Sequence, residues 1–321
     1  MATKTTAAPK TGTRRDIYAE ITDKIVAQLQ TGTRPWARPW TGTDQAEQLT
    51  RPLRAAGLPY RGINVLALWI TAECSGYRSP YWMTFKQALD FKGAVRKGEK
   101  GTLVVYANTF RKEETNAAGE TAERHIPFLK GYTVFNAQQI DGLPAHFAAP
   151  TASPEAQADP TTDKARRIAH AEAYFRNVGA TVEEAGNAAY YSPARDFIRM
   201  PPLASFPDPI DFYSTLGHEH IHWTKSSGRL ERDFGAKKMG DTGYAKEELV
   251  AELGAAFLCA DLGLSNTPRT DHAEYIATWI QHLKNDHRLI FQASAHAQRA
   301  VDYLHARQPV PIVPADAPAD E

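Results

Sequence analysis

The chain has 321 residues, more than one average domain, and its 42% hydrophobic and 10% aromatic residues suffice for packed cores. No apolar run approaches the length of a membrane span or a signal peptide, and the two cysteines do not form a CxxC pair. These features argue against a membrane protein, a disulfide framework and a cysteine zinc site. They predict a soluble protein of a reducing, cytoplasmic compartment.

The net charge of zero hides two oppositely charged halves. Residues 1–150 carry 20 Lys and Arg against 13 Asp and Glu, a difference of +7, whereas residues 151–321 carry 17 against 24, a difference of −7. A basic half suits a polyanionic partner, but uneven sampling of a solvated surface would give the same imbalance. Charge alone leaves both interpretations open.

The N-terminal half is predicted to be α+β, with its helices mostly first. An isoleucine or leucine recurs every four residues from Ile17 to Leu29, which is the spacing of one buried helix face. Two later segments, "TLVVYANTF" and "IPFLKGYTVF", are typical of strands, and the polar stretch between them predicts a long hairpin loop. We therefore expect helices over 16–30, 62–74 and 84–91, strands over 102–110 and 126–135, and a loop over 111–124.

The C-terminal half follows a stretch rich in Ala, Pro, Thr and Ser, residues 147–161, which has no apolar periodicity and predicts a linker. Further along, Asp208 offers an N-cap and Pro209 occupies the first helical position, so a helix is expected to begin there. The other predicted elements are a helix over 163–177, a strand over 180–186, a hairpin over 188–202 and further helices over 244–306.

These elements predict an α+β protein of two domains between disordered tails. Because a flexible linker lets two domains act independently, we expect the basic domain to bind its partner on its own. The expected boundaries are a basic tail over 1–13, a first domain over 14–146, a linker over 147–161, a second domain over 162–307 and a Pro-rich tail over 308–321.

The motif "HEHIH" lies on the helix that begins at Pro209 and is typical of a metal site. His218 and His222 are four residues apart, so both imidazoles lie on one face and reach one ion. Glu219 points about a quarter turn away, where it can accept the proton of a water held by that ion. The HExxH spacing therefore predicts two zinc ligands and a general base, with one Zn²⁺ per chain.

The third ligand is expected in "YAKEELVAELGAAFLCADLG", where Glu248 and Glu252 share one helix face. We expect Glu248 to bind the metal and Glu252 to hydrogen-bond a ligand histidine and fix its tautomer. Glu252 as the ligand is the second choice, and Glu247 is the third.

The alternative to a metal site is a polar helix with surface histidines. The apolar Leu216 and Ile221 and the capped start of the helix argue against it, because they predict a buried segment. His220 faces away from both ligands and is expected beside the site or at the surface. A histidine elsewhere, or Tyr244, could stabilise an oxyanion, and the sequence does not single one out.

The first half interleaves aromatic and cationic residues, a pattern typical of single-stranded nucleic-acid binding. Bases stack on rings while cations follow the phosphates, so little sequence preference is expected. The alternative is that the aromatics form the core; this is expected for Trp69, and the sequence leaves Trp36 and Trp40 undecided. The predicted DNA-binding residues are Arg34, Trp36, Arg38, Trp40, Tyr60, Arg61, Trp82, Lys86, Arg96, Lys97 and Lys100, with the turn from Arg96 to Lys100 as the phosphate contact.

Several of these segments together resemble a known family. "ITDKIVAQLQTGTRPWARPW", "PYRGINVLAL", "YWMTFKQALDFKGAVRKGEKG" and "KGYTVFNAQQIDGL" resemble the N-terminal domain of the ArdC-type antirestriction proteins, which TraC-type plasmid primases share. "HEHIHWTKSSGRLERDF" and the glutamate segment resemble the zincin-like metallopeptidase domain that follows it. The resemblance covers most of residues 14–265, and Lys225 departs from it where glycine is expected.

The resemblance implies a conjugative plasmid protein that binds incoming single-stranded DNA and protects it from restriction. Two alternatives stay open: a zinc endopeptidase that cleaves a host protein and is targeted by its DNA-binding domain, and a replication or primase accessory protein with a structural metal. The complete HExxH weakens the last, because a structural zinc does not need Glu219 and more often has four protein ligands. The sequence names no peptidase substrate.

Overall fold

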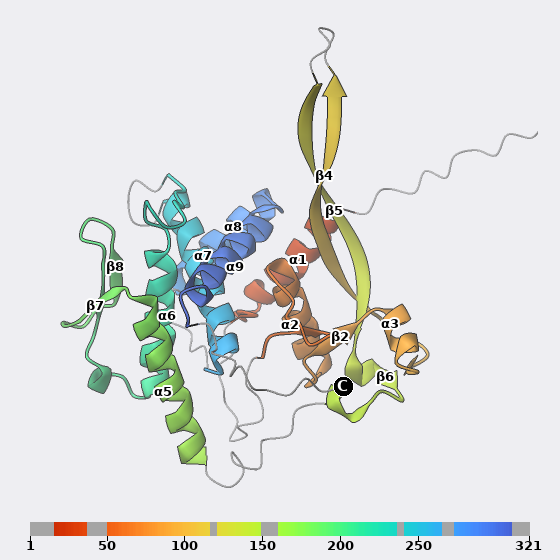
Figure 1. The fold of residues 1–321 in the computed structure, drawn as a ribbon, viewed down its shortest axis with the longest axis horizontal. Coiled ribbons are helices and arrows are strands. Elements are labelled where there is room, and N and C mark those ends of the chain that lie inside the picture. The colour runs from red at the N-terminus through yellow and green to blue at the C-terminus, as the bar shows by residue number, and fades with distance from the viewer. Residues whose placement is uncertain are drawn as a thin grey trace, which may run out of the picture.

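The computed structural model describes residues 16–36, 50–115, 121–148, 160–235, 241–264 and 273–309 (Figure 1). It contains the predicted mixture of helices and strands, so the α+β class is confirmed. None of the described helices is long and apolar enough to cross a lipid bilayer.

The N-terminal half packs two helices beside a four-stranded sheet. Helix α1 (Ile17–Gln30) matches the helix predicted over 16–30, and the Asp16 carboxylate caps it by accepting the N–H of Ala19 at 3.1 Å. The sheet has the order β1-β2-β5-β4, with the β1–β2 pair parallel and the others antiparallel. The elements are α2 (Ile63–Ser75), α3 (Phe85–Asp90), β1 (Leu53–Arg54), β2 (Tyr81–Met83), β4 (Thr102–Thr115) and β5 (Thr121–Asn136), with a small sheet of β3 (Ala94–Val95) and β6 (Ile140–Asp141).

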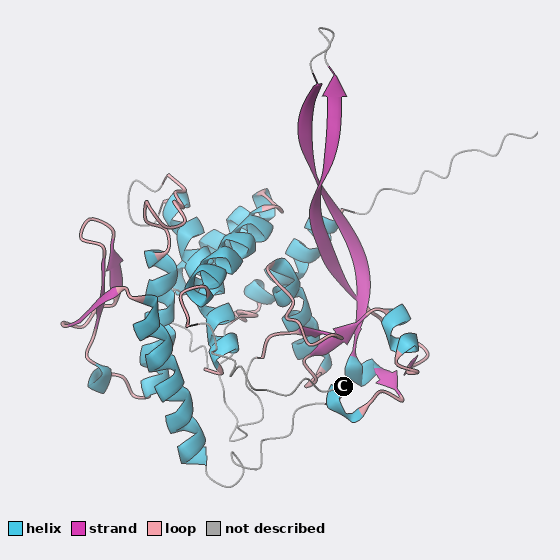
Figure 2. Cartoon of the chain, viewed as in Figure 1, coloured by secondary structure: helices cyan, strands magenta, loops and turns pink. Residues whose placement is uncertain are grey.

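Strands β4 and β5 form a long two-stranded arm that projects from the body (Figures 1 and 2). Their pairing runs without interruption from Thr102 opposite Val134 to Thr115 opposite Thr121. The loop predicted over 111–124 is therefore wrong, because most of it belongs to the two strands. The sequence of its outer part is mostly polar and does not alternate between apolar and polar residues, so it gives no strand signal. The exposed side chains of Arg111 and Glu123 form an ion pair of 3.1 Å between the two strands.

In its described parts, the C-terminal half contains helices α5 to α9 and a small sheet. The strand predicted over 180–186 and the hairpin over 188–202 are confirmed, and they form a sheet of order β7-β9-β8. The elements are α5 (Pro160–Val178), β7 (Thr181–Glu184), β8 (Tyr190–Ser192), β9 (Phe197–Met200), α6 (Pro209–Trp223), α7 (Thr242–Leu262), α8 (Ala273–Asn285) and α9 (Leu289–His305).

The two halves share one hydrophobic core. The cluster that contains Ile25 and Trp69 of the first half also contains Phe257 and Ile290 of the second. The rings of Trp69 and Phe257 lie 5.9 Å apart across this boundary. Shared burial couples the halves more closely than the charge pattern and the predicted tether suggest.

The predicted linker is only partly described. Phe147, at its start, is buried at 1% exposure, and α5 already begins at Pro160. Residues 149–159, the predicted tail over 1–13 and residues 310–321 of the tail predicted over 308–321 lie outside the described residues. The domain boundaries thus stay a prediction.

Candidate metal centre

Helix α6 carries the HExxH motif in a buried position. Asp208 caps it by accepting the N–H of Ile210 at 2.8 Å, and Pro209 occupies its first turn, as predicted. His218 and His222 are 3% and 7% exposed, and Glu219 is 2% exposed. A polar helix with surface histidines is thereby excluded, since these side chains lie in the interior.

Helix α7 brings a carboxylate to the two imidazoles. The Nε2 atoms of His218 and His222 lie 3.1 Å apart. Oxygens of Glu248 lie 3.5 Å from His218 Nε2 and 3.4 Å from His222 Nε2. One ligand atom from each residue falls within 4.8 Å of the others. Two imidazole nitrogens and a carboxylate that converge in this way fit a divalent cation.

Glu247 takes the position that we predicted for Glu252. Its Oε1 lies 3.0 Å from His222 Nδ1, so the His222 Nδ1–H can donate to it and leave the Nε2 lone pair for a metal. Glu252 instead accepts the Trp36 Nε1–H at 3.2 Å and lies 3.7 Å from Arg34 Nη1. The residue that orients His222 is thus Glu247. Adjacent positions on α7 differ by about 100°, and it is Glu247 that reaches the far edge of the His222 ring.

Arg232 completes this arrangement and was missed from the sequence. Its guanidinium donates two hydrogen bonds of 2.8 Å to the Glu247 carboxylate, and others to Ile221 O at 2.9 Å and Thr224 Oγ1 at 3.1 Å. Arg232 thus ties α7 to the C-terminal end of α6, with a side chain only 1% exposed. It follows a polar loop, where no periodicity marks a buried residue.

Lys225, the residue that departs from the family pattern, lies on the same side. Its Nζ is 3.9 Å from Glu247 Oε1. Lys225 therefore adds positive charge near the Glu247 carboxylate, which already pairs with Arg232.

The electrostatics of the site favour a positive charge between the carboxylates. Burial alone would lower the pKa of His222, but Glu248 and Glu247 raise it to about 9. Against its own burial, Glu247 has its pKa lowered to about 2 by Arg232 and His222. Burial would also raise the pKa of Glu248, but the two histidines hold it well below its usual range. A bound cation would satisfy the same carboxylate charge.

Tyr244 lies on the first turn of α7, next to Glu248. Burial first, and then the charge of Glu248, raise the pKa of its hydroxyl above the usual range. Its ring lies 5.8 Å from that of Tyr275 on α8. The phenol thus stays protonated as a hydrogen-bond donor, which is what the oxyanion role considered for Tyr244 requires.

His220 lies in the core, neither beside the metal centre nor at the surface as expected. It is fully buried, its Nδ1 is 2.8 Å from Leu216 O, and its ring lies 4.7 Å from that of Phe175 on α5. Burial lowers the pKa of this imidazole to about 4. The face of α6 opposite the metal centre packs on α5, which explains the difference.

Three aromatic residues predicted to stack on DNA are buried instead. Trp36, Tyr60 and Trp82 are 0%, 3% and 1% exposed. Stacking requires an accessible ring face, so these three predictions are corrected to core positions. Trp36 nonetheless lies near the metal centre, because its Nε1–H donates to Glu252, one helical turn after Glu248 on α7. Arg34 is half-buried beside it.

The predicted cations with described positions are mostly exposed, and two of them are paired with carboxylates. Arg96 pairs with Glu99 at 2.7 Å and with Asp141 at 3.4 Å, so its charge is already matched. Arg61 pairs with Asp302 of α9. The other predicted cations with described positions, Lys86, Lys97 and Lys100, are exposed, and Arg38 and Trp40 lie outside the described residues.

Both halves match known families. Residues 15–135 match the N-terminal domain of anti-restriction factor ArdC, and residues 169–296 match a zincin-like metallopeptidase family. The uncharacterized protein y4eC of Sinorhizobium fredii is 38% identical over 95% of each chain. DNA primase TraC of Escherichia coli is 34% identical over 91% of this chain, which spans only 27% of the primase.

Solved structures agree with the sequence comparison. The metal-free crystal structure of the antirestriction ArdC protein from plasmid R388 is 42% identical and covers 91% of this chain and 98% of its own, with a TM-score of 0.74. The Mn(II)-bound structure of the same protein has a TM-score of 0.73. With both halves matched in the same order and nearly the whole of that protein covered, the chain belongs to the ArdC-type antirestriction protein family.

Proposed function

We propose that this protein binds single-stranded DNA with little sequence preference and protects it from restriction when a conjugative plasmid enters a new cell. The observation that carries the proposal is the match of 91% of the chain, both halves in order, to an antirestriction protein. The +7 charge of residues 1–150, from 20 basic and 13 acidic residues, supports a polyanionic partner.

The second half is proposed to hold one Zn²⁺ per chain on His218, His222 and Glu248. The convergence of the three ligand atoms within 4.8 Å supports this assignment. When bound, such an ion would act as a Lewis acid and lower the pKa of a water that it coordinates. Glu247 and Arg232 fix the tautomer and orientation of His222.

Glu219 is proposed to act as the general base. It follows His218 on α6 and is buried at 2% exposure, in the same interior region as the two ligand histidines. Gln has nearly the same shape but cannot accept a proton at neutral pH. Glu219→Gln should therefore keep the fold, the metal and DNA binding, and lose peptide hydrolysis by several orders of magnitude.

The test compares the wild type with Glu219→Gln in three measurements. These are zinc content, affinity for a labelled single-stranded oligonucleotide, and plasmid transfer into a restricting host beside an otherwise identical non-restricting host. Wild-type protein should bind the oligonucleotide and raise transfer only into the restricting host. Equal transfer into both hosts with and without the protein would contradict the antirestriction role.

A second candidate function is an endopeptidase that cleaves a host protein. The observation in its favour is the complete HExxH motif beside the His218, His222 and Glu248 cluster, because a metal that only stabilises the fold does not need Glu219. Quantitative proteomics of recipient cells with wild type or Glu219→Gln discriminates the two. A host protein that disappears only with the wild type favours the peptidase.

A further inference from the structure

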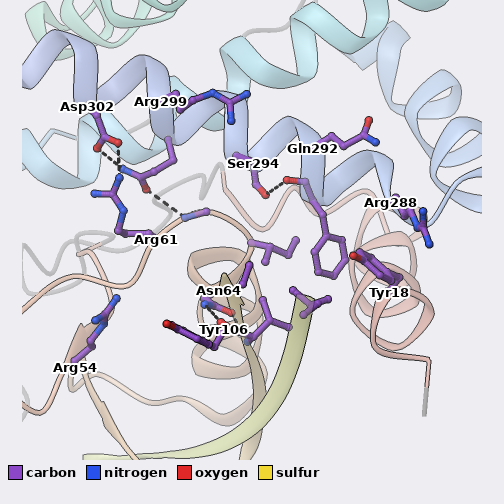
Figure 3. A pocket seen from close by; sticks show the side chains of 18 residues that line it. Tyr18, Arg54, Arg61, Asn64, Tyr106, Arg288, Gln292, Ser294, Arg299 and Asp302 are labelled. Carbon is purple, nitrogen blue, oxygen red and sulfur yellow. Dashed lines mark hydrogen bonds and ion pairs between the residues drawn. The ribbon is translucent and has the colours of Figure 1, made fainter. Parts of the chain in front are cut away.

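A cleft lies between the two halves, and none of His218, His222 and Glu248 lines it. Its volume is about 710 Å³, and α1, α2 and β4 line one side while α9 lines the other (Figure 3). This volume is typical of a site for a ligand the size of one or two nucleotides. The cleft belongs to neither half alone.

Four arginines line the cleft, two from each half. Arg54 and Arg61 come from the first half, and Arg288 and Arg299 from the second. The one acidic residue of the lining, Asp302, is paired with Arg61, so four arginines and one aspartate give a net charge of +3. The second half is acidic overall, but the part of it that lines the cleft contributes two arginines opposite those of the basic half.

Three of these arginines make no ion pair within the described parts of the chain. The Arg288 guanidinium lies 5.2 Å from the Tyr18 ring, and that of Arg54 lies 5.7 Å from the Tyr60 ring. Arg299 Nη2 lies 2.8 Å from His296 Nδ1, an uncharged contact, because burial lowers the pKa of His296 to about 4. Arg54, Arg288 and Arg299 are all exposed, so an anion in the cleft can reach them.

Aromatic rings accompany these cations. Tyr106 on β4 lines the cleft 6.0 Å from the Phe128 ring and is 50% exposed, so its side chain is accessible to a base. Across the cleft, the ring of Tyr18 on α1 packs edge to face on that of Phe291 on α9 at 4.7 Å. Accessible rings among cations are typical of sites that hold unpaired nucleotides. A duplex keeps its bases stacked inside and offers Tyr106 no free base face.

The walls of the cleft are held in place by hydrogen bonds. Gln298 Oε1 of α9 accepts the N–H of Gly62 at 3.2 Å, which ties the start of α2 to α9. The Asn64 side chain donates to Val105 O at 2.8 Å and accepts from Val105 N at 2.7 Å, which fixes β4 beside α2. The cleft is therefore built before any ligand arrives, and binding costs little ordering of the protein.

We propose that this composite cleft binds the phosphate backbone of single-stranded DNA, with Tyr106 stacking on a base and Arg288 and Arg299 of the second half contacting phosphates. The inference rests on the proposed single-stranded DNA binding and assigns it to a site in which both halves contact the strand. A free nucleotide carries the same phosphate and base, so the test must separate a strand from a mononucleotide.

The experiment uses the full chain and a labelled oligo(dT) in fluorescence anisotropy over a series of salt concentrations. Arg288→Ala and Arg299→Ala should each weaken binding about tenfold and reduce the slope of log affinity against log salt by about 0.7, because one phosphate contact on a single strand is lost. Arg176→Ala is the matched control, since this arginine is 70% exposed on α5 and does not line the cleft. Melting temperatures confirm that each variant is folded.

Tyr106→Ala gives an independent readout. Loss of stacking should weaken binding about tenfold without changing the salt slope, because no charge is removed. Tyr190→Ala is its control, since Tyr190 is 45% exposed on β8 and does not line the cleft.

The outcomes separate the two proposals. Oligonucleotide binding by wild type that is unchanged in Arg288→Ala, Arg299→Ala and Tyr106→Ala would overturn the cleft and leave single-stranded DNA binding intact. No binding by wild type would contradict the proposed function itself. Equal affinity for dTMP and the oligonucleotide, both lost in the arginine variants, would make the cleft a mononucleotide site and overturn the assignment to a strand.

Discussion

Two glutamates one turn apart on α7 have different surroundings, and we predict different effects on metal content. Glu248 faces His218 and His222, whereas Glu252 accepts the N–H of Trp36. Glu248→Ala should lose bound zinc, and Glu252→Ala should keep about one ion per chain. Elemental analysis after dialysis measures both, with His218→Ala as the reference for a lost ligand. Full zinc in Glu248→Ala and none in Glu252→Ala would reverse the assignment.

Glu247 is predicted to tune the site without touching the metal. Glu247→Gln keeps a hydrogen-bond acceptor for His222 Nδ1 but removes the charge that faces Arg232. We expect Zn²⁺ affinity to fall about 10- to 100-fold, because partners behind a ligand histidine raise its basicity. Calorimetric titration of metal-depleted protein measures the affinity, and Glu183→Gln on the exposed β7 is the control. An unchanged affinity would show that Glu247 only supports the fold.

Part of this site could be predicted from the sequence because it lies on one helix. His218, Glu219 and His222 share a turn of α6, so their spacing alone predicts the arrangement. The partners of the site come from elsewhere: Glu247 from α7, Arg232 from a polar loop, and Trp36 from the first half. A tertiary contact of this kind leaves no local periodicity. The same reason explains why Trp36 and Tyr60 resembled surface aromatics although both are buried.

At the level of elements, the β4–β5 arm is predicted to contribute little to stability. Its inner part enters the core through residues such as Leu103, Val104 and Val134. The outer part projects from the body (Figure 1). A variant that replaces residues 110–126 with a short turn should therefore keep its melting temperature within about 3 °C, since a change of 1 kcal/mol shifts a chain of this size by about 2–4 °C. A loss of 10 °C would show that the arm packs on the body.

Local sequence patterns predicted the helices that bury one face against the core. Helix α1 matches its four-residue repeat, and α6 begins at its predicted cap. The outer part of the arm was not predicted, because backbone pairing and cross-strand ion pairs such as Arg111–Glu123 hold its strands together. These interactions do not require apolar residues at alternate positions, so the sequence there gives no strand pattern.

At the scale of the whole molecule, Asp261 joins the halves through Arg51. Two hydrogen bonds of 2.9 and 3.1 Å connect them, and His305 lies 3.1 Å away. Burial would raise the pKa of Asp261, but His305 and Arg51 hold it below its ordinary value of about 3.9. A lowered pKa stabilises the fold above about pH 4, and that contribution is lost as the pH falls through the folded-state value.

Asp261→Asn should therefore cost about 1–3 kcal/mol at pH 7, and the difference from wild type should shrink as the pH falls below about 4. Urea unfolding between pH 3 and pH 7 measures this, with Asp90→Asn on the exposed end of α3 as the control. A difference that does not change with pH would mean that the mutation acts through packing alone.

The shared core leads to a prediction opposite to the one that charge suggests. The +7 half and its tether predict a domain that binds DNA alone, yet its buried side chains complete a core with the other half. Trp69 packs on Phe257, and Trp36 packs on Trp279 at 6.2 Å. Exposing each tryptophan costs about 2–3 kcal/mol, so the two together approach the 5–15 kcal/mol that stabilises a typical domain.

We therefore expect a fragment of residues 1–150 to unfold without a cooperative transition and to bind single-stranded DNA far more weakly than the full chain. Co-expression with residues 151–321 should restore both properties, because the two fragments can rebuild the common core and the cleft between them. Circular dichroism during heating and oligonucleotide anisotropy measure the two properties on each fragment and on the pair. Cooperative unfolding together with full affinity in residues 1–150 alone would establish two independent modules, and would place the DNA contacts on the first half rather than between the halves.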